Sequence, residues 1–96
     1  MKLELLSEIV NGIPGVKKDG AAALIPDDND FALYVGLAAE VLTIARLAKI
    51  TLGAEVISLE THKGEKYFFA PQDVVGARLL PAKDGGAGGR SSAGFR

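Results

Sequence analysis

The chain has 96 residues, of which 48% are hydrophobic and 24% charged, so we expect one globular domain with a modest core rather than intrinsic disorder. Its formal net charge of −1 gives no electrostatic basis for nucleic-acid binding, and no nucleic-acid partner is expected. The absence of cysteine excludes disulfides and thiolate metal sites, and it agrees with the cytoplasmic location that we expect.

The first predicted elements are short. Residues 2–11 carry apolar side chains at helical spacing and predict an amphipathic helix. Glu4 and Glu8 interrupt this apolar run, which excludes a signal peptide. Residues 17–20 predict a turn, and residues 21–25 (AAALI), bounded by a glycine and a proline, predict a strand.

The longest helical signal spans residues 31–52, FALYVGLAAEVLTIARLAKITL. Residues 27–30 (DDND) precede it and predict an N-cap. On a helical wheel, one face is a continuous apolar stripe of Leu33, Leu37, Val41, Ile44 and Ala48. The opposite half is interrupted by Val35, Ala39, Leu42, Leu47 and Ile50. Because a single sheet covers only one stripe, the second apolar surface predicts another partner. Glu40, Arg46 and Lys49 lie within the segment and argue against a membrane span.

The following segments predict a small antiparallel sheet. Residues 54–61 (AEVISLET) alternate and contain β-branched residues, which is typical of a strand. Residues 62–64 (HKG) predict a tight hairpin turn, and residues 65–70 (EKYFFA) the return strand. After a turn at residues 71–73, residues 74–80 (VVGARLL) predict a third strand. These three strands predict a meander.

The composition changes after residue 81. Residues 82–96 (AKDGGAGGRSSAGFR) are rich in glycine, serine and alanine, which is typical of a flexible linker. A phosphate-binding loop at the glycines would need a following helix and a Lys-Ser or Lys-Thr pair, and neither is present. We therefore expect one domain over residues 1–81 and a flexible tail over residues 82–96.

No catalytic, cofactor or metal site is predicted. Residues 27–30 could begin a calcium loop, but the sixth position has no glycine and the twelfth is Ala39, so helix capping is preferred. His62 is the single histidine and lies in a turn with no nucleophile pattern nearby. The aromatic residues 67–69 suit core packing better than RNA stacking, because the domain has no positive field.

The order of these elements resembles the roadblock family, also called the dynein light chain roadblock family. The matching segment is the long helix followed by EVISLETHKGEKYFFAPQDVVGARL. The residues that carry the resemblance are Val56, Leu59, Glu60, Thr61, Gly64, Tyr67, Phe69, Pro71, Asp73, Val75, Gly76, Ala77 and Leu79. It implies an α/β (α+β) roadblock/profilin-like sheet, with the central helix on one face, the N-terminal helix on the other and strands 3–5 as an antiparallel meander. Two departures, a single strand before the helix and a tail that forms no C-terminal helix, make the chain similar to shorter prokaryotic members.

The resemblance also implies a function. Roadblock proteins are non-enzymatic dimers that pair through the central helix and the strand after it, and similar prokaryotic members act with Ras-like small GTPases. The chain is therefore expected to be a homodimeric scaffold or regulator of a Ras-like GTPase, with a GTPase-activating or adaptor role, no cofactor and no membrane partner. The expected dimer interface comprises Val35, Ala38, Ala39, Leu42, Ala45, Arg46, Lys49, Glu55, Val56, Ile57 and Ser58.

An alternative function is a small-molecule-sensing or accessory subunit of a larger complex. That function needs a pocket between the central helix and the sheet, with polar groups converging inside it. The obvious polar candidates are Tyr34, Glu40 and Thr43.

Overall fold

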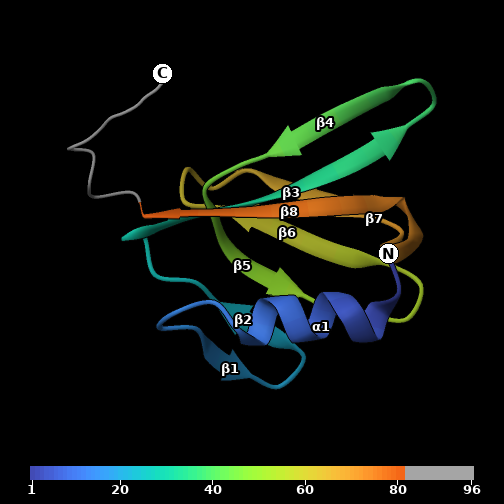
Figure 1. Cartoon of the computed structure of the whole chain (residues 1–96). Coiled ribbons are helices and arrows are strands. Elements are labelled where there is room, and N and C mark those ends of the chain that lie inside the picture. Colours follow the sequence, from blue (N-terminus) through green and yellow to red (C-terminus); the bar gives the residue numbers. More distant parts are fainter. Residues whose placement is uncertain (82–96) are drawn as a thin grey trace.

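The computed structural model describes residues 1–81 and shows an α+β protein with one short α-helix and antiparallel sheets (Figure 1). Helix α1 spans Leu3–Asn11, and Pro71–Asp73 forms a 3-10 turn. The strands are β1 (Lys17–Asp19), β2 (Ala22–Leu24), β3 (Asn29–Leu37), β4 (Glu40–Ile44), β5 (Leu47–Thr51), β6 (Ile57–Thr61), β7 (Lys66–Phe69) and β8 (Val74–Pro81). The predicted flexible tail, residues 82–96, lies outside the described residues.

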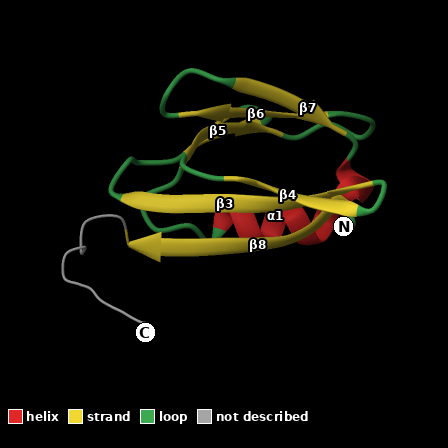
Figure 2. Ribbon diagram, turned by 90° about the horizontal axis from the view of Figure 1, so that it is seen from above, coloured by secondary structure: helices red, strands yellow, loops and turns green. Residues whose placement is uncertain are grey.

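The strands form two sheets. One has five strands in the order β1-β2-β5-β6-β7, and the other has three in the order β4-β3-β8. Every neighbouring pair is antiparallel. Figure 2 shows β3, β4 and β8 in one layer and β5, β6 and β7 in another. The chain therefore crosses between the sheets after β2, after β4 and after β7.

The prediction of a long central helix is wrong. Residues 31–52 form most of β3 and all of β4 and β5 instead. The side chains that interrupted the polar half of the helical wheel show why. Val35, Leu47 and Ile50 are fully buried, because each faces the core from a strand. Successive strands with one buried face also place apolar residues on both sides of a helical wheel, and that is the origin of the pattern here.

The turns inside this segment lack the usual sequence signals. Ala38 and Ala39 form the loop between β3 and β4, where Leu37 pairs with Glu40. Ala38 has a φ of 54°, a conformation that normally selects glycine. Arg46, between β4 and β5, has a φ of 57°. Because alanine and arginine are good helix formers, both turns read as helix in the sequence.

Several predictions outside this segment are confirmed. The N-terminal helix and the strand at residues 21–25 correspond to α1 and β2. The hairpin around residues 62–64 joins β6 to β7, with Leu59 opposite Tyr67 and Gly64 at a φ of 93°. Residues 17–20 are only partly a turn, because β1 begins there and pairs with β2 in a short hairpin.

The predicted third strand of the meander forms, but it pairs elsewhere. Strand β8 leaves β7 after the 3-10 turn and joins β3 in the other sheet, with Ala32 opposite Arg78. The prediction of a three-stranded meander is therefore wrong for its third strand, which does not pair with β7. Proline at the start of the 3-10 turn removes a backbone donor and redirects the chain between the layers.

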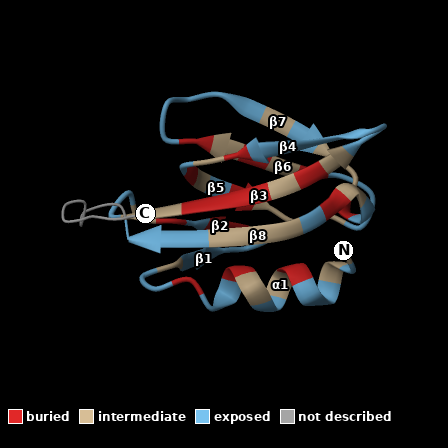
Figure 3. Ribbon diagram, turned by 45° about the horizontal axis from the view of Figure 1, so that its top comes forward, coloured by how far each residue is buried: buried red, intermediate tan, exposed pale blue. Residues whose placement is uncertain are grey.

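The core lies between the two sheets, with α1 beside β1 and β2 (Figure 1). Figure 3 shows the buried positions concentrated along the middle of β3. The largest fully buried side chains are Phe31, Leu6, Leu33, Leu47, Ile50, Ile57, Leu59, Val10, Val35 and Val74. Within residues 1–81, no helix has the length and apolar character needed to cross a membrane.

The strand assignment of residues 31–37 is tested by comparing two valines. Val35 is 0% exposed on β3, whereas Val75 is 61% exposed on β8. We expect Val35→Ala to lower the free energy of unfolding by about 2 kcal/mol, through lost burial and a cavity. Val75→Ala should change it by less than about 0.5 kcal/mol.

Urea unfolding at several protein concentrations gives the measurement. A stability loss of Val35→Ala that is the same at every concentration supports a core position. A loss that grows on dilution would instead place Val35 against a second chain, as the helical interpretation required.

Candidate functional site

The connection between β4 and β5, here called the β4–β5 corner (Ala45 and Arg46), is held from two directions. The backbone N–H of Arg46 donates to Asp30 Oδ1 on β3, with a donor–acceptor distance of 2.9 Å. The backbone C=O of Arg46 accepts the N–H of His62 from the β6–β7 turn, also at 2.9 Å. These bonds fix an arginine in the left-handed region, where a non-glycine residue costs on the order of 1 kcal/mol or more.

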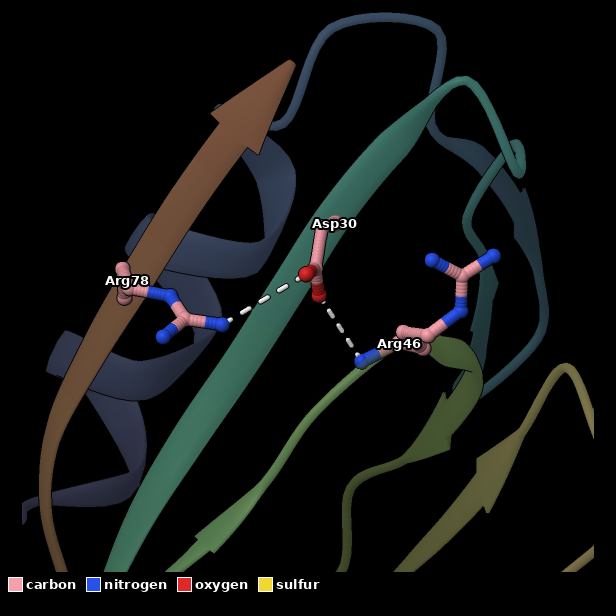
Figure 4. Close-up of polar contacts among 3 residues, drawn as sticks. All are labelled: Asp30, Arg46 and Arg78. Carbon is pink, nitrogen blue, oxygen red and sulfur yellow. Dashed lines mark hydrogen bonds and ion pairs between the residues drawn. The ribbon is translucent and has the colours of Figure 1, made fainter. Parts of the chain in front are cut away.

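Asp30 connects this corner to a third strand. Its other carboxylate oxygen lies 3.5 Å from Nη2 of Arg78 on β8. Figure 4 shows Asp30 between Arg78 and the corner, with the Arg46 guanidinium turned away from it. The Nε of Arg78 is buried without a hydrogen-bond partner in residues 1–81. The predicted role of residues 27–30 as a helix cap is therefore wrong, since Asp30 lies within β3 and bonds across the sheet.

A cavity of about 210 Å³, here called the corner pocket, lies between the β4–β5 corner and the β6–β7 hairpin. Its polar lining residues are Thr43, Arg46, Thr61, Lys63, Glu65 and Tyr67. Ile44 and Ala45 supply its apolar wall. The pocket thus joins two segments that are distant in sequence and that the Arg46–His62 bond holds together.

Thr61 fixes the hairpin side of this pocket. It is 6% exposed, and its Oγ1 accepts the backbone N–H groups of Lys63 at 3.3 Å and Glu65 at 3.1 Å. The hydroxyl hydrogen of Thr61 is thereby left to donate to another group. The Tyr67 hydroxyl donates to Glu65 Oε1 at 3.3 Å, and the Tyr67 ring stacks on Phe69 with centroids 6.3 Å apart.

The pocket carries both signs of charge. The negative charge of Glu65 raises the pKa of the Tyr67 phenol, with desolvation and their hydrogen bond as smaller causes. Asp30 and Arg78 form the one ion pair found in residues 1–81, so Arg46 and Lys63 have no carboxylate within 4.0 Å in that range. The same part of the chain contains no cluster of three or more residues suited to a metal ion.

A second, more open cleft of about 490 Å³ lies between α1 and the β1–β2 hairpin. Leu3, Ala21 and Leu52 form its apolar lining. Its cation, Lys18, already donates from Nζ to Asn11 Oδ1 at 3.0 Å. The corner pocket has more unpaired polar groups and is the better candidate for a ligand site.

The outer edge of β4 is a separate candidate surface. Among residues 1–81, β4 pairs with β3 alone, and its hairpin projects from the body of the molecule (Figure 1). Val41 is 62% exposed and Leu42 37% exposed. The strand sequence EVLTI contains no lysine, arginine or proline, the residues that usually protect an edge from pairing. Strand β1, another edge, does carry such protection in Lys17 and Lys18.

The residues expected at a dimer interface are dispersed in the structure. Val35 and Ile57 are in the protomer core and cannot meet a second chain, which corrects their assignment. The β3–β4 hairpin brings together Ala38, Ala39 and Leu42. Ala45 and Arg46 form the corner, Lys49 is exposed on β5, Glu55 and Val56 are exposed before β6, and Ser58 is half-buried on β6.

The three polar residues considered for a small-molecule pocket do not share the corner pocket. Thr43 lines the corner pocket. Tyr34 on β3 lies directly opposite Thr43, but it does not line the pocket, and its ring lies against Gly76 on β8. Glu40 is exposed next to the β3–β4 loop. The sequence signal missed Thr61, Lys63 and Glu65, because their relation to Thr43 depends on which sheet each strand joins.

No protein-family model, curated protein or solved structure matches this chain. The resemblance to the roadblock family therefore stays a prediction. Residues 31–52, which the resemblance requires as a central helix, form strands instead.

The importance of Asp30 for the corner can be measured directly. We expect Asp30→Ala to lower the free energy of unfolding by about 1–3 kcal/mol, because the N–H of Arg46 and the guanidinium of Arg78 lose their acceptor. Asp28→Ala is the control, because Asp28 is exposed and makes no side-chain hydrogen bond in residues 1–81. Chemical denaturation of both variants and the wild type measures the free energies of unfolding. Equal values for Asp30→Ala and Asp28→Ala would show that the Asp30 contacts contribute nothing to stability.

Proposed function

We propose that this protein is a non-enzymatic homodimeric interaction module, a scaffold or regulator whose protomers join through the outer edges of β4. The observation that carries the proposal is the exposed β4 edge on a projecting hairpin, which has the exposed Val41 and Leu42 and no lysine, arginine or proline. Such an edge presents unpaired backbone groups to a second strand.

The hairpin register determines which backbone groups are available. The loop of Ala38 and Ala39 makes Leu37 and Glu40 the closing pair, so Glu40, Leu42 and Ile44 direct their backbone groups toward β3. The N–H and C=O groups of Val41 and Thr43 then point outward. In an antiparallel pair of β4 strands, Val41 bonds the partner's Thr43, and Leu42 meets the partner's Leu42 on the two-fold axis.

Charge favours this antiparallel arrangement. Glu40 is the single charged residue of β4. Around a two-fold axis at Leu42, each Glu40 lies opposite the partner's Ile44, so the two carboxylates are at opposite ends of the interface. A parallel arrangement would place the carboxylates side by side, which is unfavourable. Two three-stranded sheets would thus become one continuous sheet across the dimer.

The proposed partner is a Ras-like small GTPase, and this part rests on the family resemblance alone. The resemblance is now carried by the sequence of residues 56–79 alone, since residues 31–52 form strands and β8 pairs with β3 rather than β7. Any effect on hydrolysis would come from ordering the switch loops of the GTPase. Co-purification against GTPases in both nucleotide states tests this part, and failure to recover one in either state would leave a homodimer without that partner.

The dimer is tested with a charge at the β4 edge. Val41→Lys should shift a concentration-dependent dimer to monomer, because a lysine on an edge strand disfavours pairing with a second strand. Val75→Lys is the matched control, since Val75 is equally exposed on β8, at the other edge of the same sheet. We expect this control to remain dimeric.

Light scattering after gel filtration, from micromolar to high micromolar concentration, gives the mass of each variant. A wild-type monomer throughout this range contradicts the homodimer. A dimer that survives Val41→Lys but dissociates with Val75→Lys would move the interface to β8.

A further inference from the structure

The corner pocket has the composition of a site for a small polar ligand. Six of its eight lining residues have polar side chains, and its volume is about 210 Å³. Most small-molecule sites are lined mainly by apolar side chains with a few polar groups, so the mainly polar lining of this pocket favours a polar ligand.

Hydrogen bonds hold the backbone on both sides of the pocket. The backbone of Arg46 is bonded on one side to Asp30 and on the other to His62. The Thr61 hydroxyl oxygen holds the backbone N–H groups of Lys63 and Glu65. Preformed walls reduce the entropy that a ligand must lose together with the protein on binding.

The lining of the pocket carries charges of both signs. Arg46 and Lys63 are cations without a carboxylate within 4.0 Å in residues 1–81. Glu65 is the one acidic residue of the lining, and the Tyr67 hydroxyl donates to it. A carboxylate is the natural partner of the two cations, and an ammonium group is the natural partner of Glu65.

We propose that the corner pocket binds a small zwitterion of the α-amino acid type with an apolar side chain. Its carboxylate lies toward Arg46 and Lys63, its ammonium group toward Glu65, and its side chain against Ile44. The Thr61 hydroxyl has a hydrogen left to donate to the carboxylate. This site goes beyond the proposed dimer, because none of its charged residues belongs to the β4 edge.

Three probes that share one carbon skeleton distinguish the contributions of the carboxylate and the ammonium group to binding. L-leucine carries both groups, 4-methylpentanoate lacks the ammonium group, and 3-methylbutylamine lacks the carboxylate. Titration of the full chain, followed by amide chemical shifts in ¹H–¹⁵N spectra, should show saturable shifts at residues 43–46 and 61–67. We expect leucine to bind about tenfold more tightly than either analogue, because each analogue loses a charge-assisted contact.

Variants of the hairpin identify the charged contacts. Lys63→Ala should weaken leucine binding about tenfold, whereas Lys66→Ala, which changes an exposed lysine outside the pocket, should not alter it. Glu65→Gln should weaken binding of leucine but not of 4-methylpentanoate. This difference isolates the contact between Glu65 and the ammonium group from any change in the shape of the pocket.

A pair of glycine variants controls for backbone strain. Arg46→Gly and Ala38→Gly each relieve a positive φ, at 57° and 54° respectively. We expect only Arg46→Gly to weaken leucine binding, by about tenfold. The folded state of each variant is checked by its amide spectrum before titration.

The proposal is overturned if leucine gives no saturable shifts, if the three probes bind equally, or if the shifts map to the cleft beside α1. Val41→Lys distinguishes this site from the dimer, because it leaves every lining residue of the pocket unchanged. Leucine binding that persists in a monomeric Val41→Lys variant keeps the site whatever the fate of the dimer.

Discussion

Both backbone groups of Arg46 are bonded at the point where the chain passes from one sheet to the other. Asp30 on β3 accepts the N–H of this residue, and His62 of the β6–β7 turn donates to its C=O. Since β3 and β6 belong to different sheets, one residue links the layers at the point where the chain passes between them. The same residue follows the end of β4 and lines the corner pocket, so the link adjoins both candidate surfaces.

The parts of the fold that the sequence predicted are those with local signals. Helix α1 has helical spacing, β2 is bounded by glycine and proline, and the β6–β7 hairpin has Gly64 in its turn. Residues 31–52 have no glycine or proline at either turn, so Ala38 and Arg46 gave the pattern of a continuous helix. Tertiary packing overrides the helix propensity of this segment, because the strands bury side chains such as Val35 and Ile50 completely in the core.

The candidate site could be predicted only in small part. The sequence suggests Thr43 as a pocket residue, and Thr43 lines the corner pocket. It also predicts a turn at His62, and the N–H of His62 bonds the β4–β5 corner. Thr43, Lys63 and Glu65 line the same pocket only because of the order of the strands in the two sheets, which no local sequence pattern encodes. Leu42, predicted at a dimer surface on a helix face, lies on the edge strand β4 in the structure, where the proposed dimer also places it.

The pairing of β8 with β3 has a consequence for how the molecule folds. Asp30 and Arg78 are 48 residues apart in the chain, and the strands that carry them are neighbours in the sheet. Because closing a long loop costs entropy before the contacts compensate, this pairing belongs to the slow class of folding steps. Until β8 docks, both edges of the β3–β4 hairpin are open to other strands, which exposes this hairpin to aggregation during folding.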